Sequence, residues 1–227
     1  MHDLEISGGT LGRDDVAALL GQPDFSIRFA DVDFSGTDLS RLPLEHCDFQ
    51  RCILIGATFL AAQLEGSTWT NCRGGEAIFE SAKLQDAVFT NCDLNNTRWQ
   101  RAKLSHAHFT GCKLTGANLS YCDTLGLTFS ETLLRSAFMR GISFSKTTLE
   151  NLDFTDADLT DADFRDAVFE GGSLAHARIR GARFAGADLR GADLSGFNLG
   201  DAKLFKGATI SRAQASMLLS DLGVSVV

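Results

Sequence analysis

The sequence has little of what marks a membrane protein, an exported protein or a flexible multidomain chain. Only two prolines occur in 227 residues, against 22 glycines, which suits a chain with many corners and almost no flexible linker. No apolar stretch approaches the roughly 18 residues of a membrane-spanning helix. The first residues, Met1 to Glu5, show neither a basic segment nor the apolar core of a signal peptide. We therefore expect one elongated, cytoplasmic domain that does not enter a membrane.

Catalytic motifs are also missing. The chain has no G-x-S-x-G element, no P-loop and no H-E-x-x-H element. Its five histidines are scattered, and the two that lie close together, His106 and His108, are expected to be polar surface residues. The sequence therefore predicts a protein that is not an enzyme and that uses no cofactor.

What the chain does contain is a repeat of five residues. Stepping by five from Phe29 to Leu204 gives 36 positions, of which 30 are Leu or Phe. Gly74 and Thr124 break the series, and the remaining four positions are large and apolar: Trp69, Trp99, Met139 and Ile179. A period of five fits neither an α-helix nor a flat β-strand. It predicts a chain that turns a corner every five residues and places one large side chain inward each time.

The cysteines indicate how long one circuit of this chain is. Cys52, Cys72, Cys92 and Cys112 stand at intervals of twenty residues, so a circuit has four corners. All six cysteines, with Cys47 and Cys122 included, lie two residues before a position of the five-residue series, where Ala, Ser or Thr stands elsewhere. We expect small inward thiols that stay reduced. A metal site is not expected, because no C-x₂-C pair occurs.

Within each five residues the small inward residue, a polar residue and the large inward residue follow in that order. Residues 157–161, Ala-Asp-Leu-Thr-Asp, are a clean copy of the pattern A-(D/N)-(L/F)-X-X. Over about residues 27–206 the chain resembles the pentapeptide-repeat family. The resemblance implies an all-β fold, a right-handed quadrilateral parallel β-helix of about nine coils with short helical caps. Stacked coils would follow one another at ~4.8 Å, the spacing of paired strands.

Both ends of the chain lie outside the five-residue frame. Residues 1–26 are expected to cap the first coil, with a short helix between Gly12 and Gly21 that has acidic residues in its first turn. Residues 207–227 are expected to hold a second helix, with Ser211 as its N-cap and Gly223 as its stop. A short strand is expected over residues 224–227. Open ends of a β-helix expose unpaired backbone, so such caps are required.

The C-terminal segment carries a second resemblance. Residues 214–224 resemble the tail of the Qnr quinolone-resistance proteins and of the albicidin-resistance pentapeptide protein; residues 125–127 and 136–139 also look like Qnr. The resemblance implies a homodimer formed through this C-terminal module. Its apolar residues are the candidate dimer interface: Met217, Leu218, Leu219 and Leu222. The two loops that interrupt the Qnr coil have no counterpart here, since the frame runs unbroken.

The same resemblance implies a function. Such relatives are thought to imitate duplex DNA and to engage DNA gyrase or topoisomerase IV, which relieves poisoning by drugs. The net charge is −8, and acidic residues concentrate between residues 150 and 170. The candidate partner-binding residues are an acidic belt: Asp153, Asp156, Asp158, Asp161, Asp163 and Asp166. We expect no direct binding to nucleic acid, because an acidic surface repels it.

The acidic belt has two interpretations that the sequence leaves open. It can face a protein partner, or it can supply ordinary hydrogen bonds to turns, for which Asp is well suited. Residues 171–206 lean basic, so the chain is not uniformly acidic. Two functions therefore stay open: a DNA-mimicking protein that binds a type II topoisomerase and confers resistance or self-immunity to a poison, or a non-enzymatic interaction scaffold with an unrelated partner. The Qnr-like tail favours the first.

Overall fold

The computed structural model describes the chain except for residues 1, 22–24, 198–199, 201, 221–223 and 225–227. The chain forms two compact units, residues 1–132 (unit 1) and 133–227 (unit 2), which are treated separately below. Unit 1 holds the following elements: β1 (His2–Ser7), α1 (Arg13–Leu20), β2 (Phe25–Ala30), β3 (Asp48–Gln50), β4 (Thr68–Thr70), β5 (Val88–Thr90), β6 (His108–Thr110) and β7 (Thr128–Ser130). Unit 2 holds β8 (Thr148–Glu150), β9 (Val168–Glu170), the 3₁₀ helix η1 (Ala202–Phe205) and α2 (Arg212–Ser220).

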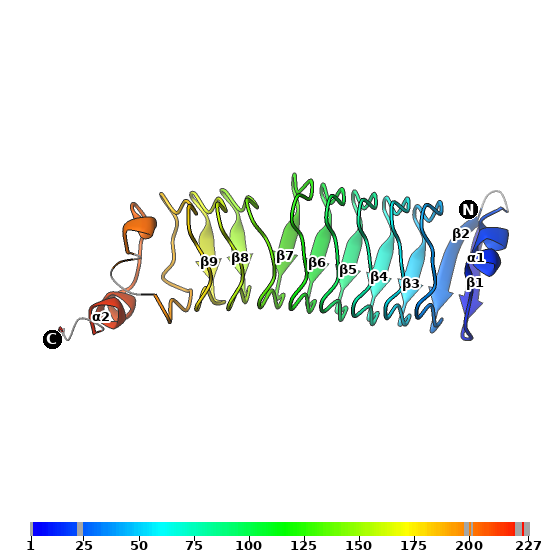
Figure 1. Ribbon diagram of the computed structural model, residues 1–227, viewed down its shortest axis with the longest axis horizontal. Coiled ribbons are helices and arrows are strands. Elements are labelled where there is room, and N and C mark those ends of the chain that lie inside the picture. The colour runs from blue at the N-terminus through cyan, green and yellow to red at the C-terminus, as the bar shows by residue number, and fades with distance from the viewer. Residues whose placement is uncertain (1, 22–24, 198–199, 201, 221–223, 225–227) are drawn as a thin grey trace. The chain divides into compact units, whose positions relative to one another are not determined.

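The strands of each unit pair in parallel, and from β2 onward the partners stand twenty residues apart, whereas β1 pairs with β2 at an offset of 23 residues. In unit 1 Phe49 pairs with Trp69 and Trp69 with Phe89, and in unit 2 Leu149 pairs with Phe169. The other three sides of a coil pair with the same offset through isolated bridges, for example Asp33↔Ile53, Asp38↔Thr58 and Pro43↔Gln63. Each circuit therefore has four sides. The predicted all-β, four-sided parallel β-helix is confirmed, and Figure 1 shows its stacked strands in unit 1.

The core is the column of large side chains at every fifth position. In unit 1 the rings of Phe49 and Trp69 stack at 3.9 Å, and those of Phe79 and Trp99 at 4.3 Å. In unit 2 the rings of Phe164 and Phe184 stack at 5.0 Å. Each fully buried Leu or Phe contributes ~1.5–3 kcal/mol by leaving water. The column is thus the main source of stability in both units.

The small inward position also serves the two buried tryptophans. The indole Nε1 of Trp69 donates to the hydroxyl of Ser67 at 2.9 Å, and that of Trp99 donates to Thr97 at 2.7 Å. Both hydroxyl residues are fully buried and stand two positions before their tryptophan. A buried indole N–H without an acceptor would be costly. The choice of Ser and Thr at these two places therefore follows from the tryptophans beside them.

The corner residue, two positions after a large residue, adopts a left-handed backbone at most described corners. Asp156, Asp161 and Asp166 have φ of 60°, 61° and 57°. Glycine stands at some corners because the side chain one coil earlier occupies its space. A Cβ on Gly181 would lie 2.1 Å from the Asp161 Oδ1, and one on Gly186 would lie 2.2 Å from the Asp166 Oδ1. Asp and Asn tolerate the left-handed region better than most residues.

The N-terminal cap contains one element that the sequence did not predict. The expected helix is present as α1, with Gly12 as N-cap and Asp14 and Asp15 in its first turn, and its Val16 is fully buried. Strand β1 was missed, although it pairs along its whole length with β2. It lies outside the five-residue frame, and only the alternation of Leu4 and Ile6 with polar residues marks it. Figure 1 shows β1 and α1 at the N-terminal end of unit 1.

The C-terminal cap is held by one glutamine. The Gln214 Nε2 donates to the carbonyls of Leu189 and Ala192, each at 2.7 Å. The Ser211 hydroxyl accepts from the Gln214 N–H, and the Gln214 side chain accepts from the Ser211 N–H, so the predicted N-cap forms a reciprocal capping box. The stop predicted at Gly223 lies outside the described residues, as does the strand expected over 224–227 apart from Val224.

Candidate interaction surface

The six aspartates of the acidic belt fall into two groups in unit 2. Asp153, Asp158 and Asp163 stand one position before a large core residue, and their side chains are 14%, 12% and 7% exposed. These three side chains are therefore mostly covered by their own chain. Asp156, Asp161 and Asp166 stand at the corners and are exposed. Only the corner aspartates can therefore meet a partner without rearrangement.

The covered aspartates make hydrogen bonds to their own turns. The N–H groups of Thr155, Thr160 and Arg165 donate to the carboxylates of Asp153, Asp158 and Asp163, at 3.0, 3.1 and 3.2 Å. Each bond spans two residues, the spacing of an Asx-turn. This geometry agrees with the turn-chemistry interpretation for these three positions. The sequence had left this interpretation open beside a partner-facing role.

Arginines also meet these carboxylates. Arg165 and Arg183 both reach Asp163, each with a distance of 2.8 Å between Nη2 and Oδ2. Arg140 and Arg178 approach Asp158 at 3.8 and 3.6 Å. Hydrogen bonding by Arg165 holds the pKa of Asp163 below its usual value against the opposing effect of burial.

Burial raises the pKa of Asp153 and of Asp158, but hydrogen bonds from Thr155 and Thr160 outweigh it, so that both pKa values are also lowered. Arg135 adds a salt bridge to Asp153. All three carboxylates are therefore ionised and neutralised by neighbours within unit 2. Charge reversal at these positions would disturb the fold as well as the surface.

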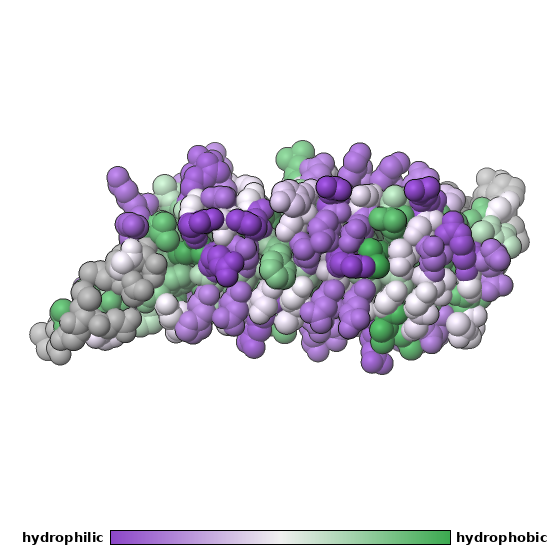
Figure 2. Space-filling model, viewed as in Figure 1, coloured by the Kyte–Doolittle hydropathy of each residue, from purple (hydrophilic) through white to green (hydrophobic). Residues whose placement is uncertain are grey.

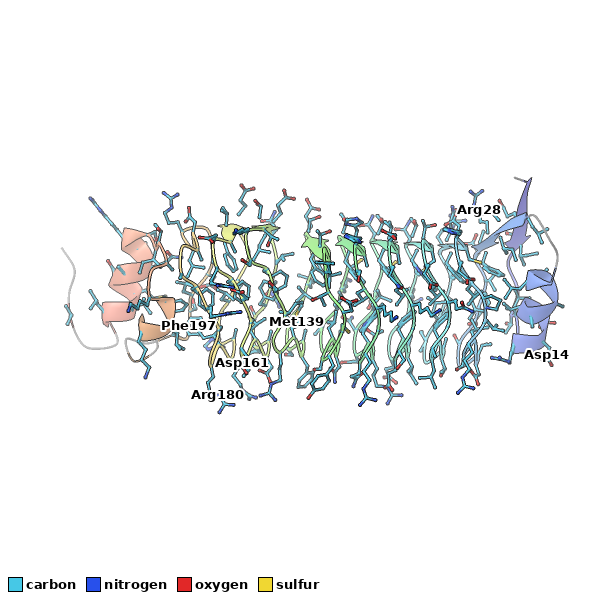
Figure 3. The ribbon with its side chains drawn as sticks, turned by 90° about the horizontal axis from the view of Figure 1, so that it is seen from above. Asp14, Arg28, Met139, Asp161, Arg180 and Phe197 are labelled. Carbon is cyan, nitrogen blue, oxygen red and sulfur yellow. The ribbon has the colours of Figure 1, made fainter. Side chains whose placement is uncertain are left out.

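The corner aspartates are different in their surroundings. Asp156, Asp161 and Asp166 lie on three successive corners of one coil. Among the described residues none of the three takes part in a salt bridge. Figure 3 labels Asp161 at the margin of unit 2. These corners thus offer exposed negative charge, to which the exposed Glu150 and Glu170 of unit 2 add. Figure 2 shows that hydrophilic side chains cover much of the visible face of unit 2.

The candidate dimer interface divides in a similar way. Leu218 is 4% exposed, so this side chain is already buried within its own chain. Met217 and Leu219 on α2 are half-buried and keep some apolar surface open. Leu222 lies outside the described residues. The dimer remains a prediction, and the described side chains that can carry it are Met217 and Leu219.

The cysteines line the small inward positions of unit 1. Five of the six are buried, Cys122 is half-buried, and all are free thiols. Cys52 and Cys72 donate to the carbonyls of Phe29 and Phe49, one coil earlier, at 3.2 and 3.3 Å. Within the described part of the chain, no group of three His, Cys, Asp or Glu side chains is arranged to hold a metal ion. No described helix is long and apolar enough to cross a bilayer.

The fold defines a class of protein: a four-sided parallel β-helix built on a repeat of five residues. Two family models match the chain. One, the pentapeptide repeat region, covers residues 62–139, and the other, pentapeptide repeats (8 copies), covers residues 27–68, 126–161 and 162–201. The chain belongs to the pentapeptide-repeat family. No curated protein sequence matches it.

Solved structures agree on the fold. The full-length structure of QnrB1, a plasmid-mediated fluoroquinolone resistance protein, is 22% identical with a TM-score of 0.54, and 99% of each chain is covered. HetL, a pentapeptide repeat protein involved in heterocyst differentiation regulation from the cyanobacterium Nostoc sp. strain PCC 7120, is 23% identical with a TM-score of 0.43 and covers 84% of this chain and 88% of its own. At 22% identity the likeness to QnrB1 shows the fold alone.

Proposed function

We propose that this protein binds a type II topoisomerase, DNA gyrase or topoisomerase IV, as a DNA mimic and confers resistance or self-immunity to a topoisomerase poison. The observation that supports this most directly is the set of exposed carboxylates of Asp156, Asp161 and Asp166. They display negative charge around one coil, where a basic DNA-binding surface can meet it. The Qnr-like residues of the C-terminal segment, 214–224, add support.

The proposed contact is electrostatic and lies at the corners. The covered aspartates, such as Asp163, are neutralised by arginines and contribute little field. The corner carboxylates have no such partner among the described residues, so they keep their charge in the complex. Exposed charges are screened beyond ~8 Å at 0.15 M ionic strength. The affinity for the topoisomerase should therefore fall as salt rises.

The decisive experiment removes charge without changing the corner backbone. The test variant carries Asp156→Asn, Asp161→Asn and Asp166→Asn, because Asn also tolerates positive φ. The control variant carries Glu76→Gln, Asp86→Asn and Glu131→Gln, which removes three negative charges from exposed corners of unit 1 with φ of 62°, 58° and 49°.

Drug-stabilised DNA cleavage by gyrase and by topoisomerase IV is measured with each protein added in increasing amounts. We expect the unsubstituted protein to lower cleavage, the test variant to need about tenfold more protein for the same effect, and the control variant to behave like the unsubstituted protein. If the unsubstituted protein neither binds either enzyme nor changes cleavage, the scaffold function replaces this proposal. If both variants lose the same amount of this effect on cleavage, the corners of unit 2 are not the specific contact with the enzyme.

A further inference from the structure

The part of unit 2 that follows the corner aspartates is rich in arginine. Asp158 and Asp163 are each approached by two guanidinium groups, so four arginines surround two carboxylates. The four side chains stay between 48% and 73% exposed. Arg180 and Lys203 add two more cations for which no salt bridge is recorded among the described residues. Arg180 and Lys203 are thus cations without a carboxylate partner in the described part of an otherwise acidic chain.

A hollow of about 460 Å³ opens beside these cations. Its polar lining includes His176, Arg178, Arg180 and Lys203, and Phe197 contributes an apolar wall. None of the described residues that line it is acidic. Its volume falls within the range of sites that hold small ligands, roughly 300–1,000 Å³. Figure 3 labels Arg180 and Phe197, with the Arg180 side chain projecting away from the ribbon.

We propose that this hollow binds a small molecule through a phosphate group. The guanidinium of an arginine offers a planar fork of donors that matches phosphate oxygens, and a lysine adds a compact charge. Arg178, Arg180 and Lys203 place three such cations around one space. A group with more than one negative charge fits this arrangement better than a single carboxylate does, because three fixed cations repel one another until they are neutralised.

Two contacts hold the lining side chains in position. Arg178 is fixed by Asp158, with 3.6 Å between Nη1 and Oδ2, while its side chain is 73% exposed. One carboxylate contact at that distance leaves most of its five N–H donors available to a ligand. The imidazole of His176 lies over Gly196, where a Cβ would stand 2.1 Å from Nδ1. Glycine at this corner therefore leaves the space that the imidazole occupies.

A second hollow of about 340 Å³ lies beside the first and shares His176 and Arg178 with it. Its lining includes Asp156 and Asp158, so the acidic side chains belong to that neighbouring space. Arg180 and Lys203 line only the first hollow. The second hollow thus places carboxylates next to Arg178, whereas the described lining of the first hollow holds none. In the proposal the phosphate therefore binds in the first hollow, next to Arg180 and Lys203.

Net charge argues for a small ligand over a long polyanion. The chain carries −8 overall, and the corner carboxylates of unit 2 are exposed. A duplex would run past these charges and be repelled, whereas a molecule with one or two phosphates meets only the hollow. The proposed topoisomerase contact depends on the corner aspartates and the phosphate site on Arg178 and Arg180, so different variants test the two proposals.

Calorimetric titration of the full chain with inorganic phosphate and with pyrophosphate, at low salt, tests the proposal. The test variant carries Arg178→Gln and Arg180→Gln. The matched control carries Arg101→Gln and Arg212→Gln, two exposed arginines outside the hollow. We expect pyrophosphate to bind one site more tightly than phosphate, the test variant to bind about tenfold more weakly, and the control to stay within about twofold.

Thermal unfolding of each variant checks that the fold is kept. If the double variant does not fold, Arg180→Gln alone is used, because Arg180 has no recorded salt bridge to lose in the described part of the chain. Absence of binding by both phosphates at millimolar concentration would overturn the proposal. An equal loss of phosphate affinity in the test and control variants would also overturn it, because the phosphate would then be attracted by exposed positive charges in general and not by one site. Tighter binding of a 20-base-pair DNA duplex through the same two arginines would replace the small-ligand site with a nucleic-acid surface.

Discussion

The guanidinium of Arg183 reaches across one coil to the carboxylate of Asp163, with 2.8 Å between Nη2 and Oδ2. Arg165 meets the same carboxylate from within its own turn, and its backbone N–H also donates to it. The Asp163 side chain is only 7% exposed. This aspartate therefore ties two successive coils together and shapes a turn, which is a structural task. Asp161, two residues earlier in the chain, does neither.

This contrast gives a stability prediction with an internal control. Asp163→Asn removes the charge that two arginines share and should lower the free energy of unfolding by about 1.5–3 kcal/mol. Asp161→Asn makes the same chemical change at an exposed corner and should stay within about 0.5 kcal/mol. Urea unfolding at pH 7 measures both. Equal effects of the two substitutions would mean that the arginine contacts add no stability.

The contact between Asp163 and Arg165 also makes the free energy of unfolding depend on pH in the acid range. The pKa of Asp163 is lowered in the folded chain, chiefly by its hydrogen bond to Arg165. A lowered carboxyl pKa stabilises the fold above the unfolded value, ~3.9, and this stabilisation is lost as pH falls through the folded value. The difference in unfolding free energy between the unsubstituted protein and Asp163→Asn should therefore shrink below about pH 4. A difference that stays constant from pH 7 to pH 3 would contradict this assignment.

The thiols of unit 1 should be protected by the fold. Burial raises the pKa of Cys47 and of Cys122 to about 12, so that neither forms a thiolate at neutral pH. Thiol titration of the native protein should find few reactive groups, and all six should react in denaturant. Half-buried Cys122 should be the first to react. Rapid labelling of most thiols without denaturant would show that the inward positions are open.

The raised thiol pKa values also predict alkaline instability. A cysteine whose folded pKa is near 12 keeps its proton while the unfolded chain loses it above ~8.5. Stability is then complete below the unfolded pKa and is lost as pH rises toward 12. The melting temperature should fall between pH 9 and pH 11, and Cys47→Ala with Cys122→Ala should reduce that fall. If the melting temperature of the double variant falls as much as that of the unsubstituted protein, groups other than these two thiols cause the alkaline instability.

The five-residue repeat made the fold predictable from the sequence. The orientation of the polar side chains could not be predicted in the same way. A large residue at every fifth position has one arrangement that buries all of them, so the core, including Trp69 and Trp99, could be assigned from spacing. The pattern could not decide whether Asp163 faces a partner or its own turn, because its position points away from the core while its carboxylate folds back onto the turn. Its partners, Arg165 and Arg183, stand two and twenty residues later, and both offsets could have been checked in the sequence.

Where the chain leaves the frame, prediction depended on local signals. Helices α1 and α2 carry caps that the sequence displays, and both were expected. Strand β1 lies outside the frame and shows only six residues of weak alternation, so its pairing with β2 could not be inferred. Gly74, a break in the core column, is accommodated because Leu54 and Leu94 fill the space where its side chain would be.

The dimer prediction can now be made more specific. Met217 and Leu219 are half-buried, whereas Leu218 is buried within its own chain. Met217→Asp with Leu219→Asp should convert a dimer into a monomer that keeps its fold, because each side chain already faces some solvent. Leu218→Ala should instead lower stability by about 2–4 kcal/mol through an internal cavity. Sedimentation analysis and urea unfolding separate the two effects. An unsubstituted chain that sediments as a monomer at micromolar concentration would refute the dimer.

The last prediction concerns the glutamine that closes the C-terminal end of unit 2. The Gln214 side chain is buried, and its Nε2 donates to the carbonyls of Leu189 and Ala192. Gln214→Ala would leave both carbonyls and the Ser211 N–H without these partners, at a cost of about 1–3 kcal/mol. Gln214→Glu keeps the capping box with Ser211 but brings a carboxylate against the two carbonyls, so it should cost at least as much.

Hydrogen exchange shows where that loss occurs. We expect the amides of residues 184–197 to exchange faster in Gln214→Ala, because the last coil then opens more often, while the amides of unit 1 keep their rates. Ser220→Ala is the control, since its exposed hydroxyl bonds only to a carbonyl of the same helix, that of Met217. If exchange accelerates equally throughout both units, Gln214 supports global stability and is not a local cap. If neither stability nor exchange changes, other contacts of α2 close the coil.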